Sequence, residues 1–431
     1  MEQKKRKAAL HNLGCKVNAY ETEAMLQQLE QKGYEIVSFE ETADIYVINT
    51  CTVTSIADRK SRQMLHRARK KNPDALVVAV GCYVQADKAR AEADTAVDLV
   101  IGNDQKSRLA ELIETHANAT LDINATRSYE SLHISRSTGH TRAFLKIQDG
   151  CNQFCSYCLI PYVRGRVRSR QPEDIYEEAA RLAENGCREI VLTGIHLSSY
   201  GCDFDGAPMG EHLKDLILRM AEIPQLSRIR LGSLEPRVIT REFAEALRDC
   251  GKICPHFHLS LQSGCDATLK RMNRKYDTAR YMESCDLLRQ YFDDPAITTD
   301  LITGFPEETE EEFAQTLDFI ARVGFADMHV FPYSIRPGTK AAEMRQIDMP
   351  VREERAARAS AVAKTMHEAY LACCVGKIFP VLFERDRKGG SAGHAPNYME
   401  VSVAQEGLHN QVKNVKITAV DGGSLRGELE E

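Results

Sequence analysis

The chain has 431 residues, 43% of them hydrophobic and 27% charged, with a formal net charge of −6. This composition is typical of a soluble globular protein, and the length favours two or three domains. No apolar run approaches the roughly 20 residues of a membrane span, which excludes a membrane protein. Since we see no export signal and no overall basic charge, we expect a cytoplasmic protein whose nucleic-acid contacts come from local patches.

Residues 1–120 alternate short apolar runs with helical patterns, and this β-α-β-α-β order predicts a small parallel α/β domain. Three of the runs, "KAALHNLGC", "ADIYVINTCTVT" and "DALVVAVGC", contain Cys15, Cys51 and Cys82 at or near their ends. Because the carboxyl ends of parallel strands share one edge of a sheet, the three thiols could meet there. The polar residues 121–141 are predicted to form a linker.

Residues 142–372 are predicted to form a barrel. Helical patterns separate most of six strand-like runs, at residues 143–150, 189–194, 228–233, 256–264, 296–305 and 327–334. This order predicts a parallel (β/α)6 barrel, complete or partial, with its chemistry at the carboxyl ends of the strands. Residues 350–374 have a helical pattern, and we expect that helix to leave the barrel. Residues 373–431 alternate apolar and polar side chains between turns, which predicts a small all-β barrel.

The strongest motif directly follows the first barrel strand. In "GCNQFCSYC" (150–158), Cys151, Cys155 and Cys158 have the spacing Cys-x3-Cys-x2-Cys. Three thiolates suit an iron–sulfur cube with one iron free of protein ligands. Structural zinc needs four ligands, and no fourth Cys or His lies nearby in the sequence. A zinc site and three unrelated buried cysteines are the alternatives.

This motif resembles the signature of radical S-adenosylmethionine enzymes, and the six β/α units resemble their partial barrel. The resemblance implies that Cys151, Cys155 and Cys158 hold a catalytic [4Fe-4S] cluster. Its open iron would bind S-adenosylmethionine, whose reductive cleavage yields a 5′-deoxyadenosyl radical.

The segments "LGCKVNAYET", "INTCTVT" and "VAVGCYVQ" extend the resemblance to methylthiotransferases over nearly the full length. That family carries a second [4Fe-4S] cluster, which implies Cys15, Cys51 and Cys82 as its ligands. It also carries a C-terminal TRAM-type β-barrel that binds RNA, which residues 373–431 resemble.

Three branches of the family differ in substrate. "GCKVNAYET", "LKIQDGCNQFCSYC" and "GHAPNYMEV" resemble the branch that methylthiolates C2 of N6-threonylcarbamoyladenosine, next to the anticodon of tRNA. The isopentenyladenosine branch more typically has Gly-Cys-Gln-Met-Asn where this chain has Lys16, Val17 and Asn18. The resemblance implies as partners a tRNA carrying threonylcarbamoyladenosine, an electron donor such as flavodoxin or ferredoxin, and a sulfur source. Isopentenyladenosine, a ribosomal-protein aspartate, and a non-catalytic zinc-bearing RNA-binding protein are the alternatives.

Polar or glycine-containing turns close the barrel strands. Their side chains could bind S-adenosylmethionine or could serve the turns alone. These cofactor-binding candidates are Gly194, Ser233, Glu235, Gln262, Ser263 and Asp300.

Arginines occupy every second position after the cysteine motif. In an extended segment they would point to one side and could bind the RNA phosphate backbone, although a solvated loop explains them as well. These RNA-binding candidates are Arg164, Arg166, Arg168 and Arg170.

Overall fold

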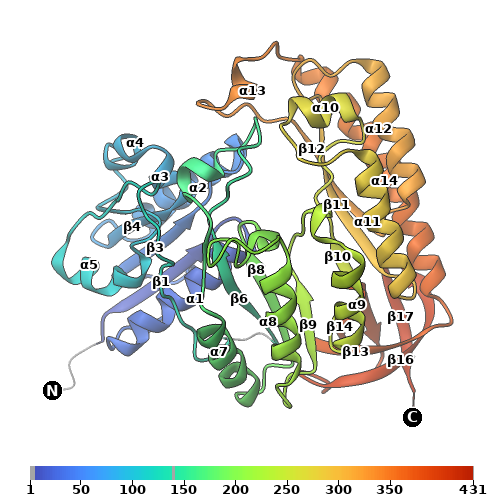
Figure 1. The fold of residues 1–431 in the computed structure, drawn as a ribbon. Helices are drawn as coiled ribbons and strands as arrows, with labels where there is room; N and C mark the ends of the chain where they lie inside the picture. Colours follow the sequence, from blue (N-terminus) through green and yellow to red (C-terminus); the bar gives the residue numbers. More distant parts are fainter. Residues whose placement is uncertain (1–4, 138–140, 431) are drawn as a thin grey trace.

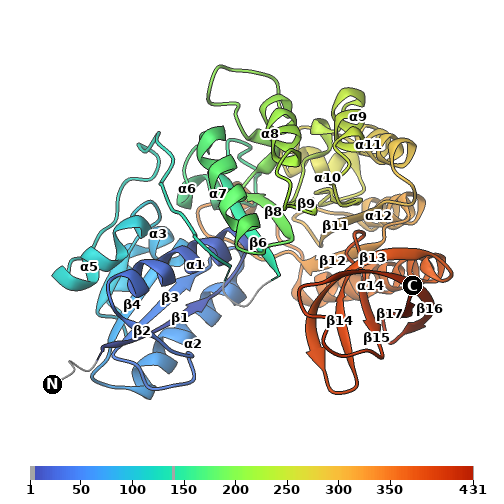
Figure 2. The ribbon, with the colours of Figure 1, turned by 90° about the horizontal axis from the view of Figure 1, so that it is seen from below.

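The computed structural model describes residues 5–137 and 141–430 and confirms the predicted α/β class. Figures 1 and 2 show an N-terminal sheet unit, a central unit and a C-terminal β-barrel side by side. Residues 138–140 of the predicted linker, and 1–4 and 431 at the chain ends, lie outside the described residues. Within the described part, no helix is both long enough and apolar enough to cross a bilayer.

The N-terminal unit is a five-stranded sheet, in the order β2-β1-β3-β4-β5, whose neighbouring strands are all parallel. Two apolar clusters cover its two faces, which explains why β3 is buried along its whole length. The strands are β1 (Lys7–Asn12), β2 (Glu35–Ile36), β3 (Ile45–Thr50), β4 (Leu76–Gly81) and β5 (Leu99–Ile101). The helices are α1 (Lys16–Gln31), α2 (Ser55–Lys71), α3 (Cys82–Ala86), α4 (Lys88–Glu92) and α5 (Leu109–Thr115), with the 3-10 turn η1 (Lys106–Arg108).

The central unit is a partial barrel, as predicted. Its six parallel strands follow the order of the sequence, and isolated bridges connect β9 to the segment around β10. On its other side β6 pairs with the short antiparallel strand β7 (Arg168–Ser169). The parallel strands are β6 (Arg142–Asp149), β8 (Glu189–Gly194), β9 (Arg228–Leu231), β10 (His256–His258), β11 (Ala296–Thr303) and β12 (Asp327–Pro332).

Helices cover the outside of this partial barrel (Figure 1). One apolar core spans the strands and the helices packed on them, and it includes Tyr20 of α1 from the N-terminal unit. The helices and turns are α6 (Ile160–Val163), α7 (Pro172–Glu184), η2 (Leu197–Ser199), α8 (Glu211–Ala221), η3 (Pro236–Val238), α9 (Arg241–Asp249), α10 (Asp266–Arg271), α11 (Thr278–Tyr291), α12 (Glu310–Val323), α13 (Lys340–Glu343) and α14 (Met349–Cys374).

Helix α14 does not leave the barrel along its length, contrary to our expectation. It packs on β12, β11 and α12, and only its last turn joins the C-terminal core through Leu371 and Cys374. The boundary predicted at residue 372 therefore falls inside this last turn. The predicted linker also contributes buried side chains, Ile123, Leu132 and Ile134, so it is packed against the protein.

The C-terminal unit is a closed five-stranded barrel in the order β13-β14-β15-β17-β16, as predicted. Its strands are β13 (Ile378–Arg387), β14 (Gly390–His394), β15 (Glu400–Val403), β16 (Val412–Asp421) and β17 (Ser424–Leu429).

The loop between β14 and β15 closes the amino-terminal end of the central barrel. The Tyr398 ring stacks on His256 and His394, each at 4.9 Å between ring centroids. The guanidinium groups of Arg142 and Arg230 lie 5.1 and 4.7 Å from the same ring. These contacts plug the barrel at its base and leave the carboxyl ends of the strands for the site.

Candidate functional site

The first cysteine trio, Cys151, Cys155 and Cys158, lies in the loop after β6. Gly150 has a φ of +71°, and a Cβ atom there would stand 1.8 Å from the Arg166 carbonyl oxygen, so only glycine fits. The Cys151 N–H donates to the Gly165 carbonyl at 3.0 Å. The tight turn after the strand is therefore fixed against the arginine-rich segment.

The turn after α10 holds the other side of this loop. The Ser156 N–H donates to the Met272 carbonyl at 3.0 Å, and its hydroxyl donates to the Arg271 carbonyl at 2.8 Å. The Asn273 amide donates to the Phe154 carbonyl at 2.9 Å. These bonds position the trio before any metal binds.

Donors point at all three sulfurs of the first trio. The N–H groups of Gln153 and Ile160 lie 3.5 and 3.4 Å from the sulfurs of Cys151 and Cys158. Arg274 Nη1 lies 3.2 Å from Cys155 Sγ. Burial raises the pKa of Cys151 to about 11 and that of Cys158 to about 12, so metal binding must displace protons.

The second trio, Cys15, Cys51 and Cys82, lies at the carboxyl ends of three adjacent strands, β1, β3 and β4. A Cβ atom on Gly14 would stand 2.8 Å from Cys51 Sγ, which shows how closely the β1 turn approaches the end of β3. The Asn18 amide joins the same turns by donating to the carbonyls of Leu13 and Thr50 at 2.7 and 3.0 Å. The structure thus brings together three thiols that are far apart in sequence.

Two donors point at Cys82. Arg164 Nε lies 3.2 Å and Asn103 Nδ2 lies 3.5 Å from its sulfur. Burial raises the pKa of Cys51 to about 12, and the neighbouring Cys82 thiol contributes in the same direction. This second trio therefore has the same design as the first: clustered thiols with an arginine hydrogen-bonded to one of them.

The two cysteine trios differ from a site that holds a single metal ion. No three His, Cys, Asp or Glu side chains in residues 5–137 and 141–430 are grouped closely enough to hold one metal ion. Sulfurs on one zinc would sit within about 4 Å of each other, because each Zn–S bond is about 2.3 Å. In a four-iron cube each cysteine binds a different iron, which spreads the sulfurs apart. Each trio offers three thiols and hydrogen-bond donors to its sulfurs, which suits a cube with one iron free of protein ligands.

Arg164 lies in a buried ionic network between the N-terminal and central units. Its guanidinium contacts Glu21 Oε1 at 2.5 Å and Asp149 Oδ2 at 3.2 Å. Lys146 contacts the same two carboxylates at 2.8 and 2.6 Å, and Lys106 also binds Glu21. All five side chains are at most 5% exposed. Because Glu21 belongs to α1 and Asp149 to β6, the network ties the two units together.

The prediction that the four alternating arginines bind the RNA backbone is wrong for three of them. Arg164, Arg168 and Arg170 are at most 2% exposed, so their guanidinium groups face protein and not solvent. The four arginines do not lie on one side of an extended segment, because Arg164 caps α6 and only Arg168 belongs to a strand.

The other members have protein partners as well. Arg168 donates to the Arg164 carbonyl at 2.9 Å, and Arg170 contacts Glu178 at 2.6 Å. Arg166 alone is half-buried, with its guanidinium 4.4 Å from the Phe154 ring centroid. It is the one member of the four that is not fully buried.

Two of the cofactor-binding candidates are carboxylates with basic partners at the barrel interior. Burial alone would raise the pKa of Glu235, but hydrogen bonds from Arg237 and the His196 imidazole 3.4 Å away outweigh it and lower the pKa to about 2. Asp300 lies 3.2 Å from His258 Nε2 and 3.3 Å from His329 Nδ1. These two hydrogen bonds outweigh burial and hold its pKa well below the usual value, so both carboxylates are charged acceptors.

Gln262, Gly194 and Ser233 also lie at the carboxyl ends of strands. Gln262 has a φ of +70° and bonds through its N–H to the Asp300 carbonyl. A Cβ atom on Gly194 would stand 2.8 Å from the Gln148 side chain, so close packing also explains this glycine. Ser233 is exposed after β9.

Ser263 does not face the site. Its side chain is fully buried, and its hydroxyl lies 3.4 Å from that of Thr316 on α12, in the outer layer. The prediction that it binds the cofactor is wrong, because the chain turns at Gln262, whose φ is positive, and Ser263 then faces the outer layer.

A cavity of about 220 Å³ lies between the central and N-terminal units. Val53 and Thr54 reach it from the segment after Cys51, and Tyr157 reaches it from within the first trio. Gln262 and Asp300 line its barrel side. A ligand in this cavity would therefore border residues next to both trios.

A clasp of residues 52–58 and 334–336 closes one side of this cavity. Arg336 donates to the Thr52 hydroxyl at 2.7 Å and contacts Asp58 at 2.8 Å, and the hydroxyls of Ser55 and Ser334 lie 3.0 Å apart. Sequence analysis missed these residues, as it missed Glu21 and Arg274. Only the segment "IRPGTKA" gave a local signal, a Pro-Gly turn.

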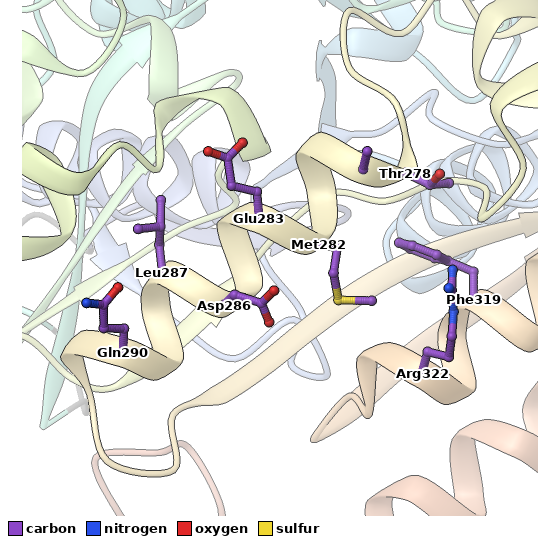
Figure 3. Close-up of a pocket in the computed structure, with 9 residues that line it drawn as sticks. Thr278, Met282, Glu283, Asp286, Leu287, Gln290, Phe319 and Arg322 are labelled. Atoms are coloured by element: carbon purple, nitrogen blue, oxygen red, sulfur yellow. The ribbon is translucent and has the colours of Figure 1, made fainter.

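A larger surface hollow, about 600 Å³, lies elsewhere (Figure 3). Side chains from α11 and α12 line it, among them Met282, Glu283, Leu287, Phe319 and Arg322. It is on the outer helical layer and holds neither a cysteine nor a residue from the carboxyl end of a strand, so we do not assign the chemistry to it.

Models of known protein families match the central and the N-terminal unit. Residues 145–320 match the model of the radical SAM superfamily, and residues 7–102 match an uncharacterized protein family, UPF0004. In solved structures, the radical S-adenosylmethionine methyltransferase TsrM of Kitasatospora setae is similar with a TM-score of 0.56 and 16% identity, covering 78% of this chain and 77% of that one. This likeness supports the fold.

Curated relatives cover nearly the whole chain. The threonylcarbamoyladenosine tRNA methylthiotransferase MtaB of Bacillus subtilis is 40% identical over 95% of this chain and 93% of its own length. MtaB of Aquifex aeolicus is also 40% identical, over 81% of this chain and 86% of its own. A tRNA-2-methylthio-N(6)-dimethylallyladenosine synthase of Thermoanaerobacter is 35% identical over 98% and 92%. The chain therefore belongs to the family of radical S-adenosylmethionine methylthiotransferases.

Proposed function

We propose that this enzyme methylthiolates C2 of N6-threonylcarbamoyladenosine next to the anticodon of tRNA. One observation carries the proposal: a single cavity has walls from both units, with Val53 and Thr54 from the segment after Cys51 and Tyr157 from the loop of the first trio. A substrate carbon in that cavity would lie near residues beside both trios, which in this proposal supply hydrogen abstraction and sulfur. The 40% identity to MtaB relatives favours threonylcarbamoyladenosine as the substrate.

The cofactors of this proposal are S-adenosylmethionine and two [4Fe-4S] clusters. Cys151, Cys155 and Cys158 hold the first cluster, and Cys15, Cys51 and Cys82 hold the second. When bound, the first supplies an open iron and an electron for cleaving S-adenosylmethionine, and the second supplies a place for the sulfur.

The protein's own groups then orient the bound molecules. Glu235 and Asp300 stay charged and accept hydrogen bonds from the ribose hydroxyls or amino group of S-adenosylmethionine, with Gln262 between them along the strand ends. Gly194 and Ser233 border the same end of the barrel. The Tyr398 plug closes the opposite end, which limits the water that reaches a reactive intermediate.

RNA contacts and further partners complete the proposal. The C-terminal barrel and the half-buried Arg166 are the RNA-contacting parts. A flavodoxin- or ferredoxin-type protein donates electrons, and a separate source restores sulfur. A tRNA substrate implies action in the cytoplasm.

Anaerobic reconstitution tests the assignment. The loaded protein receives S-adenosylmethionine, a reductant and tRNA carrying either threonylcarbamoyladenosine or isopentenyladenosine, and nucleosides are analysed by mass spectrometry. We expect a methylthio product only from the first tRNA. Product from isopentenyladenosine alone would assign the second candidate, which the 35% identical synthase supports. Product from neither tRNA would redirect the search to a ribosomal-protein aspartate.

Cysteine variants separate the two trios. Cys151→Ala should abolish cleavage of S-adenosylmethionine, whereas Cys15→Ala should keep cleavage and lose the methylthio product. Cys373→Ala is the matched control, because this thiol is exposed and belongs to neither trio. Equal loss in the Cys15 and Cys151 variants would contradict the division of roles.

A further inference from the structure

We infer that Arg164 and Arg274 are positioning residues that each set the reduction potential of one cluster. The inference rests on the proposed function, which assigns a cluster to each trio. Both arginines lie outside the trios, and each places one guanidinium nitrogen 3.2 Å from one cysteine sulfur, Cys82 and Cys155 respectively. Each trio thus has one thiol with an arginine donor.

Arg274 is fixed by neighbours of the first trio. Its Nη1 donates to Cys155, and its Nε donates to the Tyr276 hydroxyl at 2.9 Å. The Tyr276 hydroxyl in turn donates to the Leu261 carbonyl at 3.0 Å. The guanidinium therefore keeps its direction toward Cys155 without help from the cluster.

Arg164 reaches the second trio from the loop of the first. Its next residue, Gly165, accepts the N–H of Cys151 at 3.0 Å, while its own Nε donates to Cys82. Its two Nη atoms bind Glu21 and Asn18, each at 2.5 Å at the closest. One arginine therefore ties the backbone of one cluster loop to a ligand of the other cluster.

A charge argument gives the direction of the effect. When a cluster gains one electron, negative charge increases on its sulfur atoms while no ligand bond forms or breaks. A cationic donor at a sulfur stabilises that reduced state and raises the potential. The effect is strongest where the donor is buried, and Arg164 is fully buried. Removing either donor should make its own cluster harder to reduce.

Redox titration of single-cluster proteins tests this. Full-length protein with Cys15, Cys51 and Cys82 changed to Ala keeps only the first cluster, and the converse triple variant keeps only the second. Arg164→Gln, Arg274→Gln and the control Arg166→Gln are introduced into both backgrounds. Potentials are read anaerobically by electron paramagnetic resonance, without tRNA. Arg166 is the control because its guanidinium lies over the Phe154 ring and, within the described residues, makes no hydrogen bond to a cysteine sulfur.

We expect a reciprocal pattern. Arg164→Gln should lower the potential of the second cluster by at least a tenfold change in the one-electron equilibrium, 59 mV, and leave the first unchanged. Arg274→Gln should do the reverse. Arg164→Lys keeps the charge without the planar donor and should recover part of the shift. If Arg164→Gln fails to retain iron, the potential of the second cluster in Arg164→Lys decides whether Arg164 sets that potential.

Two results would overturn the inference: no shift in either arginine variant, or equal shifts at both clusters. Its failure differs from failure of the proposed function. Loaded clusters with unchanged potentials would refute only the arginine roles, whereas absence of iron at either trio in the unmodified protein would refute the ligand assignment itself.

Discussion

Replacing Glu21 by Gln removes the charge that holds three buried cations. Its carboxylate contacts Lys106, Lys146 and Arg164, and all of these side chains are at most 1% exposed. These cations outweigh the cost of burial and hold the pKa of Glu21 well below its usual value. The variant leaves Asp149 to compensate Lys146 and Arg164, and it leaves Lys106 without an ion pair to a carboxylate within the described residues.

The magnitude follows from the geometry. At about 3 Å and an effective dielectric constant of about 20, each ion pair contributes about 5 kcal/mol before desolvation is subtracted. The variant also removes the desolvation cost of the buried carboxylate, which offsets much of this attraction. Breaking a buried ion pair therefore costs about 3–5 kcal/mol in net terms. We expect Glu21→Gln to lower the free energy of unfolding by that amount.

Urea unfolding of the protein measures this loss. The chain has no tryptophan, so far-UV circular dichroism and tyrosine fluorescence are the signals. Glu30→Gln is the control on the same helix, since its pair with Arg136 is partly exposed and should contribute less than about 1 kcal/mol. A loss below 1 kcal/mol in Glu21→Gln would refute the view that this carboxylate joins the two units.

Three other perturbations have defined outcomes. Gly150→Ala should abolish iron in the first trio, because its Cβ would overlap a carbonyl oxygen at 1.8 Å; full iron content by elemental analysis would contradict the steric argument. The stability contributed by Glu235, whose pKa falls from 4.5 to about 2 on folding, is present above pH of about 5 and lost as pH falls toward 2. It amounts to about 3 kcal/mol, so Glu235→Gln should flatten the acid limb of the unfolding curve, and a curve parallel to that of the unmodified protein would exclude the effect. Tyr398→Ala should cost about 2–4 kcal/mol through lost ring stacking and cation–π contacts, seen as faster proteolytic release of the C-terminal barrel; unchanged release would mean that the plug is not stabilising.

Sequence patterns predicted most of the fold. The six strand-like runs correspond to β6 and β8 to β12. They could be recognised because parallel strands that are buried on both faces have nearly continuous apolar sequences, such as "EIVLTG". The course of α14 could not be predicted, because its apolar positions do not say which neighbour they cover. Packing against β12 and β11, set by the rest of the barrel, decides it.

The candidate site was partly predictable as well. Cys15, Cys51 and Cys82 could be brought together because strand ends share an edge of the sheet, whereas the partners of Arg164 could not. Alternating arginines have the same local pattern whether they face RNA or buried carboxylates, and Glu21 lies 143 residues from Arg164 in the sequence. Ser263 was mistaken because the positive φ of Gln262 shifts which residue faces inward.

The Tyr398 plug has a consequence for how the chain folds as it is synthesised. The base of the barrel is sealed by a residue made long after the strands that it seals, and Arg230 finds a carbonyl partner in Pro396 only then. Until the loop that carries Pro396 and Tyr398 leaves the ribosome, the strands around that opening lack these contacts. A chain that ends before this loop would therefore keep both cysteine trios but have a central barrel without the Tyr398 contacts at its base.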